Sequence, residues 1–252
     1  MVRRPGSSRG PEGRPHQRHN LCVAPVLYAD HASDMTETMT SPASESWLGQ
    51  LDTELAARLR FLLEADRLKT VLRGSRIADG SRRENTAQHS WHIALFALLL
   101  TPYATGRVDP SRVVSMLLIH DLVEIDCGDT PLFDTEGSAT QAEREKLAAD
   151  RLYGLLPPDD AAIYRALWDE FEDAKTDDAR FAKSIDRLQP IILNHAVGGG
   201  TWSDYAVDET RERVLTSRIA DGSPALWAAA EAVIGDAVHR GWLKPSPNSK
   251  VA

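Results

Sequence analysis

The sequence predicts an all-α fold, and three observations support this prediction. Apolar residues recur every three or four positions from Trp47 onward, Pro- and Gly-rich breakers separate the periodic segments, and no segment shows the strict alternation typical of a strand. With 252 residues, of which 42% are hydrophobic, the chain has enough apolar material for one sizeable core. We therefore expect one helical domain plus a tail.

The composition changes along the chain and indicates where that domain begins. Residues 1–45 are rich in Gly, Pro, Ser, Arg and His, so they bury too little apolar surface to offset the entropy of ordering, and we expect a disordered N-terminal extension. The folded domain is expected at 46–243 and a flexible C-terminal tail at 244–252. Met35 offers a second start, so the sequence leaves open whether residues 1–34 belong to the native product.

Charge, cysteine usage and hydropathy narrow the class of partner and the compartment. A formal net charge of −8 argues against a nucleic-acid polymer, because polymer binding needs many phosphate-neutralising cations. Two cysteines suggest no disulfide framework. The longest apolar runs, such as IALFALLL, are far shorter than the roughly 20 residues of a membrane span, and no signal-peptide pattern follows the N-terminal arginines. We expect a cytoplasmic protein without a membrane partner.

Each of the first two predicted helices has an apolar stripe. After Trp47, leucines recur at helical spacing, as one buried face requires: Leu48, Leu51, Leu55, Leu59 and Leu62. The next periodic segment begins near Thr86, a plausible N-cap, and carries two stripes, one of Trp91, Leu95 and Leu98 and one of His89, His92, Phe96 and Leu99. We expect this second segment to be a buried central helix.

The remaining helices are marked by start and stop signals. Asp109 and Pro110 start a helix that puts Met116, His120 and Glu124 on one side, and Gly128 ends it. Further helices are expected at about 138–156, 159–173, 177–196, 207–219 and 223–241, between Pro-Pro, GGGTW and DGSP breakers.

Four residues on these helices could bind a divalent metal: His89, the adjacent His120 and Asp121, and Asp186. They are far apart in the sequence, so they meet only if three helices pack side by side around one cavity, as in metal-binding helical bundles. Each residue also has a simpler explanation, because a His on an apolar helix face is more often a hydrogen-bonded core residue than a ligand. An isolated His-Asp dipeptide is weak evidence.

The sequence segments around these four residues are more specific evidence. The segments RRENTAQHSWH, LLIHDLVEIDCGDT and FAKSIDRLQP resemble the HD phosphohydrolase superfamily, in particular its 5′-deoxynucleotidase-like branch, from about Leu62 to Asn194. The resemblance implies an HD-domain helical bundle in which His89, His120, Asp121 and Asp186 hold the metal.

The histidine count also distinguishes between branches of that superfamily. No His occurs between Asp121 and Asp186, where binuclear relatives typically place further ligands, so a mononuclear site is expected. His92 is interpreted as a packing or supporting residue. One divalent ion is the expected cofactor, with Mn²⁺ or Co²⁺ favoured and Fe²⁺, Zn²⁺ and Mg²⁺ left open.

The same resemblance suggests which residues act on substrate. Glu124 and Asp129 match carboxylates that serve catalysis and substrate placement in the nucleotidase branch, although a surface Glu and a turn Asp are the simpler explanations. Arg73 resembles the arginine that grips phosphate, and a guanidinium suits a phosphate because its donors match two oxygens. The irregular connection GSRIADGSRR leaves Arg76, Arg82 or Arg83 as alternatives.

The sequence differs from the 5′-deoxynucleotidase-like branch at one position that bears on the sugar of the substrate. Deoxynucleotidase relatives can carry a bulky aromatic residue directly after that arginine, where this chain has Gly74, so a preference for deoxyribose does not follow. The expected function is a metal-dependent 5′-nucleotidase that removes phosphate from (deoxy)nucleoside monophosphates. A nucleotide pyrophosphohydrolase of the same superfamily and a non-catalytic regulatory HD-fold protein are the alternatives. The expected partner is a small phosphorylated substrate, and family analogy implies a homodimer.

Overall fold

The computed structural model describes residues 46–134 and 140–246, and helices dominate them. The helices and strands of the first half are η1 (Ser46–Gln50), α1 (Thr53–Ala65), η2 (Asp66–Thr70), β1 (Leu72–Arg76), β2 (Arg83–Asn85), α2 (Thr86–Leu100), η3 (Thr101–Tyr103), α3 (Pro110–Ile119), η4 (His120–Val123) and α4 (Glu124–Cys127). The second half comprises α5 (Gln141–Tyr153), α6 (Pro158–Asp173), α7 (Asp177–Ala196), α8 (Thr201–Asp204), α9 (Glu209–Thr216), α10 (Ile219–Gly222) and α11 (Pro224–His239). The predicted all-α class is confirmed.

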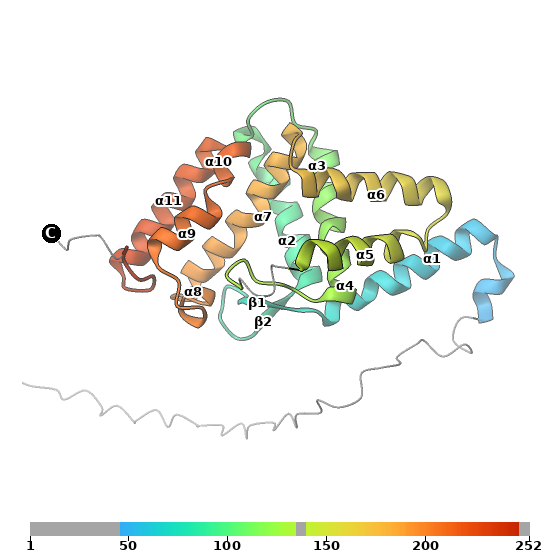
Figure 1. Cartoon of the computed structure of the whole chain (residues 1–252), viewed down its shortest axis with the longest axis horizontal. Helices are drawn as coiled ribbons and strands as arrows, with labels where there is room; N and C mark the ends of the chain where they lie inside the picture. The colour runs from blue at the N-terminus through green and yellow to red at the C-terminus, as the bar shows by residue number, and fades with distance from the viewer. Residues whose placement is uncertain (1–45, 135–139, 247–252) are drawn as a thin grey trace, which may run out of the picture. The chain divides into compact units, whose positions relative to one another are not determined.

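Helix α7 is the centre of the arrangement. It packs against α2, α3, α6, α10 and α11 and also touches β1. In Figure 1 it crosses between α9, α10 and α11 on one side and α5 and α6 on the other. The predicted bounds of this helix, 177–196, agree with the structure, but the predicted central position of the α2 segment is wrong, because α7 occupies that place.

Two apolar clusters hold the helices together. The larger one lies around α7 and includes Phe181, Ile185 and Ile191 with residues of α2, α3 and α11. The smaller one joins η2, η4, α5 and α6 through residues such as Leu122, Tyr153 and Trp168. At about 25 cal/mol per Å² of apolar surface removed from water, such clusters are the main stabilising contribution to the fold.

The largest error of the sequence analysis is a missed hairpin. Strands β1 and β2 pair antiparallel, with Leu72 opposite Asn85 and Arg76 opposite Arg83. Both strands are short and rich in polar residues, so neither shows the apolar alternation by which strands are recognised. The connection in which Arg73 lies is therefore a defined strand, and its backbone fixes the direction of that side chain.

The predicted buried stripes of the first two helices are also wrong in part. On α1 only Ala56 is buried, while Leu55 is 46% and Leu62 is 60% exposed. On α2 the stripe of Trp91, Leu95 and Leu98 faces outward, and the buried face carries instead Thr86, His89, Ser90, Ile93, Ala94 and Ala97. Asn85 rather than Thr86 caps α2, with its side chain accepting from the Gln88 backbone N–H.

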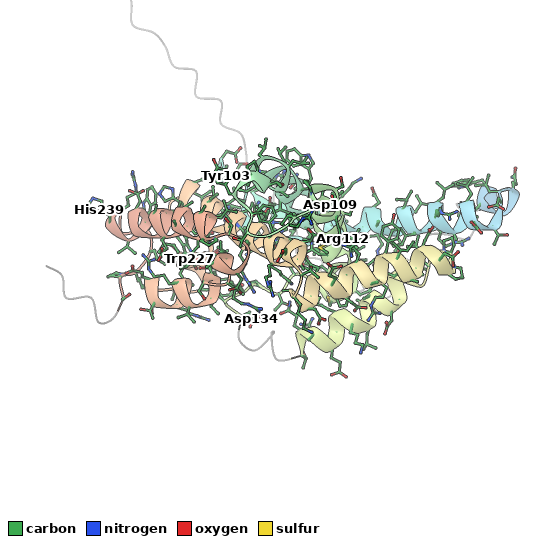
Figure 2. The ribbon with its side chains drawn as sticks, turned by 90° about the horizontal axis from the view of Figure 1, so that it is seen from above. Tyr103, Asp109, Arg112, Asp134, Trp227 and His239 are labelled. Carbon is green, nitrogen blue, oxygen red and sulfur yellow. The ribbon has the colours of Figure 1, made fainter. Side chains whose placement is uncertain are left out.

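The third predicted helix is divided at the proposed ligands. Asp109 caps α3 and Pro110 occupies its first turn, as predicted, and Asp109 and Arg112 lie at the surface (Figure 2). The α-helix ends at Ile119, and His120 begins a short 3₁₀ turn, which passes into α4 at Glu124. Gly128 then ends α4 with a φ of 73°, a left-handed conformation that favours glycine.

The ends of the chain and one loop are only partly covered. The expected extension at 1–45 lies outside the described residues, as do 135–139 and 247–252. Of the expected C-terminal tail, Lys244 forms an isolated parallel bridge with Asp208, and its carbonyl oxygen accepts from the Glu209 N–H at 2.8 Å. Among the described residues no helix has the length and hydropathy of a membrane span.

Candidate metal centre

Three elements distant in the sequence carry the four predicted metal ligands. His89 lies on α2, His120 and Asp121 lie on η4, and Asp186 lies on α7. The Nε2 atom of His89 is 3.0 Å from Oδ1 of Asp186. The Nε2 atom of His120 is 2.9 Å from Oδ1 of Asp121. Ligand atoms of His89, His120 and Asp186 all lie within 4.8 Å of one another, so the fold brings three of the four predicted ligands together, and Asp121 adjoins both histidines.

Each imidazole is oriented by a contact at Nδ1. His120 Nδ1 lies 3.0 Å from the carbonyl oxygen of Leu117, and because a carbonyl only accepts, Nδ1 carries the proton. Gln189 serves His89 in the same way: its amide nitrogen donates to Glu84, so its oxygen, 3.2 Å from His89 Nδ1, is the acceptor. In both rings Nε2 is therefore the atom left to face the carboxylates.

This arrangement fits a divalent cation. The Nε2 atom of His120 is buried and has no hydrogen-bond partner, although it faces Asp121 and Asp186. A lone pair opposite carboxylate oxygens is repulsive unless a proton or a cation lies between them. Imidazole nitrogens and carboxylate oxygens are common ligands of first-row divalent metals. The residues present can therefore hold such an ion.

The ionisation of the same groups agrees with this interpretation. Burial lowers the pKa of His120, but the Asp121 and Asp186 carboxylates outweigh burial and raise this pKa to about 10. Burial also acts to raise the pKa of Asp186, yet the neighbouring imidazoles of His120 and His89 hold it well below its usual range. Without metal the cluster keeps a proton, and metal binding releases protons from such sites.

The three residues predicted to act on substrate lie beside this cluster. Glu124 is buried on α4, and its Oε2 accepts a hydrogen bond from Thr86 Oγ1 at 2.7 Å. Arg73 Nη1 lies 2.9 Å from Asp121 Oδ2, 3.5 Å from Glu124 Oε1 and 3.4 Å from Asp129 Oδ1. One guanidinium is thus shared by three carboxylates from η4, α4 and the loop after it.

Burial affects the pKa values of Glu124 and Arg73. It raises the pKa of Glu124 well above its usual value, and the nearby Asp121 adds to this effect while Arg73 opposes it. Burial acts to lower the pKa of Arg73, but Asp129 and the other carboxylates outweigh it, so the guanidinium stays charged. Its Nε atom is buried without a hydrogen-bond partner and remains available as a donor.

The alternative arginines lie elsewhere. Arg76 donates to the carbonyl oxygen of Gly80, and Arg82 donates to Gln88 Oε1; both side chains and that of Arg83 are exposed. None of the three lines the cavity next to the metal cluster, whereas Arg73 does.

That cavity has a volume of about 310 Å³, within the range of about 300–1,000 Å³ typical of small-molecule sites. It extends from the ligand cluster along α7, past Arg187, Pro190 and Ile191 to Asn194. Residues 129–133, which follow α4, border it, and Asp134 comes directly after them (Figure 2).

Sequence analysis missed several residues of the site. Gln189, which orients His89, lies three residues after Asp186 and so on a neighbouring helix face, a spacing that could have indicated it. Arg187 follows the ligand directly, and its pKa is lowered by burial, with Asp186 opposing. Glu212 also lines the cavity but lies in a segment without any motif. His92 contacts Gln189 rather than the metal cluster.

The fold is helical, and two imidazole Nε2 atoms and two carboxylates face one polar cavity. This combination is that of a metal-dependent hydrolase of the HD type. The family model of the HD domain matches residues 65–227. The chain belongs to this family.

Solved and curated relatives agree with this assignment. The crystal structure of a predicted metal-dependent phosphohydrolase from Magnetospirillum magnetotacticum MS-1 is 52% identical in sequence and superimposes with a TM-score of 0.74, covering 77% of this chain and 97% of its own. The 5′-deoxynucleotidases of Mus musculus and Danio rerio are 28% and 30% identical over 54% of this chain and 68% of each relative. A bacterial 5′-deoxynucleotidase, from Erwinia tasmaniensis, is 27% identical over 136 residues. The chain is an HD-type phosphohydrolase.

Proposed function

We propose that this protein is a 5′-nucleotidase that releases inorganic phosphate from nucleoside monophosphates. The observation that carries the proposal is the shared guanidinium of Arg73, which joins the metal cluster to Glu124 and Asp129 in one cavity. The similarity to curated 5′-deoxynucleotidases supports the same substrate class. A small nucleotide also suits a cavity of about 310 Å³.

The proposed metal ligands are His89, His120, Asp121 and Asp186. A divalent ion there supplies Lewis acidity, which lowers the pKa of a water molecule and neutralises phosphoryl charge. We favour Mn²⁺ or Co²⁺ for this nitrogen and oxygen ligand set. Leu117 and Gln189 keep both imidazoles in the tautomer that binds metal through Nε2.

The neighbouring residues supply the remaining requirements of phosphoryl transfer, which are positioning and charge stabilisation. Glu124 exchanges the proton; burial raises the pKa of this carboxyl group well above its usual value, which favours its role as a proton carrier. Asp129 fixes Arg73 by accepting from Nη1. The unpartnered Nε of Arg73 then donates to a phosphate oxygen.

We propose that ribose and deoxyribose substrates are both accepted. At Gly74 an added Cβ atom would lie 3.3 Å from Cγ2 of Thr201 and 3.7 Å from Pro131, so the strand packs closely there. No aromatic side chain projects from this position to crowd a 2′-hydroxyl group.

We further propose a cytoplasmic homodimer. The apolar side chains left exposed on α1 and α2 offer the surface: Leu55, Leu62, Leu63, Trp91, Leu95, Leu98 and Leu99. Exposed apolar residues in this number commonly mark protein interfaces. Light scattering of the wild type and of Leu98→Lys measures this directly, and a wild-type monomer would contradict it.

The test of function is a product assay. Metal-stripped protein is reloaded with Mn²⁺ or Co²⁺ and incubated with nucleoside mono-, di- and triphosphates and with sugar phosphates. We expect inorganic phosphate from monophosphates and none from Asp121→Ala. Pyrophosphate release from triphosphates would favour a pyrophosphohydrolase instead. The absence of any hydrolysis, with the metal bound, would indicate a regulatory protein.

A further inference from the structure

Glu212 is a buried acid that the proposed reaction does not use. It lies on α9, its side chain is almost fully enclosed with 1% of the residue exposed, and it lines the same cavity as the metal cluster. Its Oε2 atom has no hydrogen-bond partner of normal geometry. The Nε1–H group of Trp202, which also has none, interacts with Glu212 only weakly: it lowers the pKa of the carboxyl group but does not outweigh burial. A buried polar atom left unpaired destabilises the fold, so a partner is expected in the working protein.

Position along the cavity indicates what that partner is. On α7 the lining runs from Asp186 at the metal cluster to Asn194, eight residues on, which is about 12 Å at 1.5 Å per residue. Asn194 binds the backbone N–H of Thr201 at 3.0 Å, and Trp202 follows directly. Glu212 itself lies on α9, which in Figure 1 is on the other side of α7 from α4, the helix that carries Glu124. This is the side of the cavity on which a nucleotide with its phosphate at Arg73 and Glu124 would place its base.

The chemistry of the group selects among bases. At a pH above its pKa of about 7, Glu212 is a carboxylate that only accepts hydrogen bonds, so it then favours a base edge that carries N–H donors and disfavours one that carries a keto oxygen. Guanine, adenine and cytosine carry an exocyclic amino group, whereas uracil, thymine and hypoxanthine carry oxygen or hydrogen at the matching positions. Sites built to bind a substrate N–H reject the analogue that lacks it, because their own polar group is then left unpaired.

We propose that Glu212 is a specificity-determining residue that accepts a hydrogen bond from the exocyclic amino group of the substrate's base. The proposal rests on the proposed nucleotidase function for the identity of the substrate. The orientation of α9 supports this proposal, since Thr216, one turn after Glu212, also lines the cavity. Burial raises the pKa of Glu212 to about 7, as expected of an acid that waits for a donor.

The test compares bases that differ at one group. Calorimetry on the full-length, Mn²⁺-loaded protein measures the binding of cytidine against uridine and of guanosine against inosine, which carry no phosphate and cannot react. We expect the amino-bearing nucleoside to bind roughly tenfold or more tightly in at least one pair, since a hydrogen bond to a charged group contributes about 1.5–3 kcal/mol. Glu212→Gln, which keeps the shape of the side chain, should reduce this ratio to near one.

A matched control separates the outcomes. Glu209→Gln on the same helix removes an acid that binds Arg213 rather than the cavity, and it should keep the wild-type ratio. Equal binding within both pairs by the wild type, or a ratio that survives in Glu212→Gln, overturns the proposal. Base discrimination without hydrolysis of any monophosphate leaves the proposal standing and contradicts the nucleotidase function instead.

Discussion

Arg73 Nη1 lies 2.9 Å from Oδ2 of Asp121, so a residue of the β1 strand contacts one of the proposed metal ligands. The same nitrogen also faces Glu124 and Asp129. Arg73 therefore has two separable parts, a charge that balances the acids and a planar fork that binds oxygen atoms in pairs.

Replacing Arg73 by Lys tests the second part. A lysine retains the charge but loses the fork, so we expect KM for a nucleoside monophosphate to rise roughly 10- to 100-fold while the melting temperature changes little. Steady-state kinetics and thermal unfolding measure both. Arg82→Lys is the control, because Arg82 is exposed in the same hairpin segment; if that variant is impaired and Arg73→Lys is not, the phosphate contact lies elsewhere.

Glu124→Gln should keep the metal and lose most of the turnover. The substitution preserves the shape of the side chain but removes its exchangeable proton, and a positioned general acid or base contributes about 10²- to 10⁴-fold. Metal content by mass spectrometry and kcat are measured together. Asp126→Asn on the same helix is the control, since Asp126 binds Arg151 at the surface. Parallel loss of metal and rate would make Glu124 a ligand.

Gln189→Leu should weaken metal binding without removing a ligand. It deletes the acceptor that holds the His89 ring, and partners of this kind typically contribute about 10- to 100-fold in metal affinity. Competition with a chelator gives the Mn²⁺ dissociation constant. Gln141→Leu, which lines the cavity but binds Glu145, serves as the matched control. Unchanged Mn²⁺ affinity in Gln189→Leu would refute the orienting role.

The stability of Glu212→Gln relative to the wild type should depend on pH. Burial raises the pKa of Glu212 from 4.5 to about 7, so the folded state holds its proton more tightly than the unfolded chain. The wild type then loses stability as pH rises from about 4.5 to 7, by roughly 3 kcal/mol at about 1.4 kcal/mol per unit, and Gln lacks this loss. Urea unfolding of both proteins between pH 4.5 and 8 measures the difference, and a constant difference contradicts the shift.

Hydrophobic periodicity predicted the positions of the helices well, but it predicted poorly which of their faces are exposed. The bounds of α7 follow from the Thr176 cap and the Gly-rich end, which are local signals. Leu55 and Leu62 share a face as predicted, but spacing alone does not say whether that face is covered. The hairpin escaped prediction because its pairing, not its composition, makes it a strand.

The candidate site shows the same contrast between local sequence signals and tertiary packing. Its proposed ligands were recognised by resemblance, within motifs that are each continuous in sequence. Gln189 and Glu212 gain their importance only when α7 packs on α2 and when α9 closes on the cavity, which no local pattern encodes. A sequence motif can therefore indicate residues whose chemistry a short segment carries, whereas residues that meet only through tertiary packing carry no such signal.

The separation of His89 from Asp186 by 97 residues has a consequence for how the protein matures. A chain still being synthesised, or one in which α7 has not docked, has no preformed cluster and so little selective affinity for the ion. If the proposed ligands bind an ion, its capture would then be a late event that requires a completed tertiary structure. It also locks that structure, since an ion at 100 times its dissociation constant adds about 2.7 kcal/mol to the free energy of unfolding.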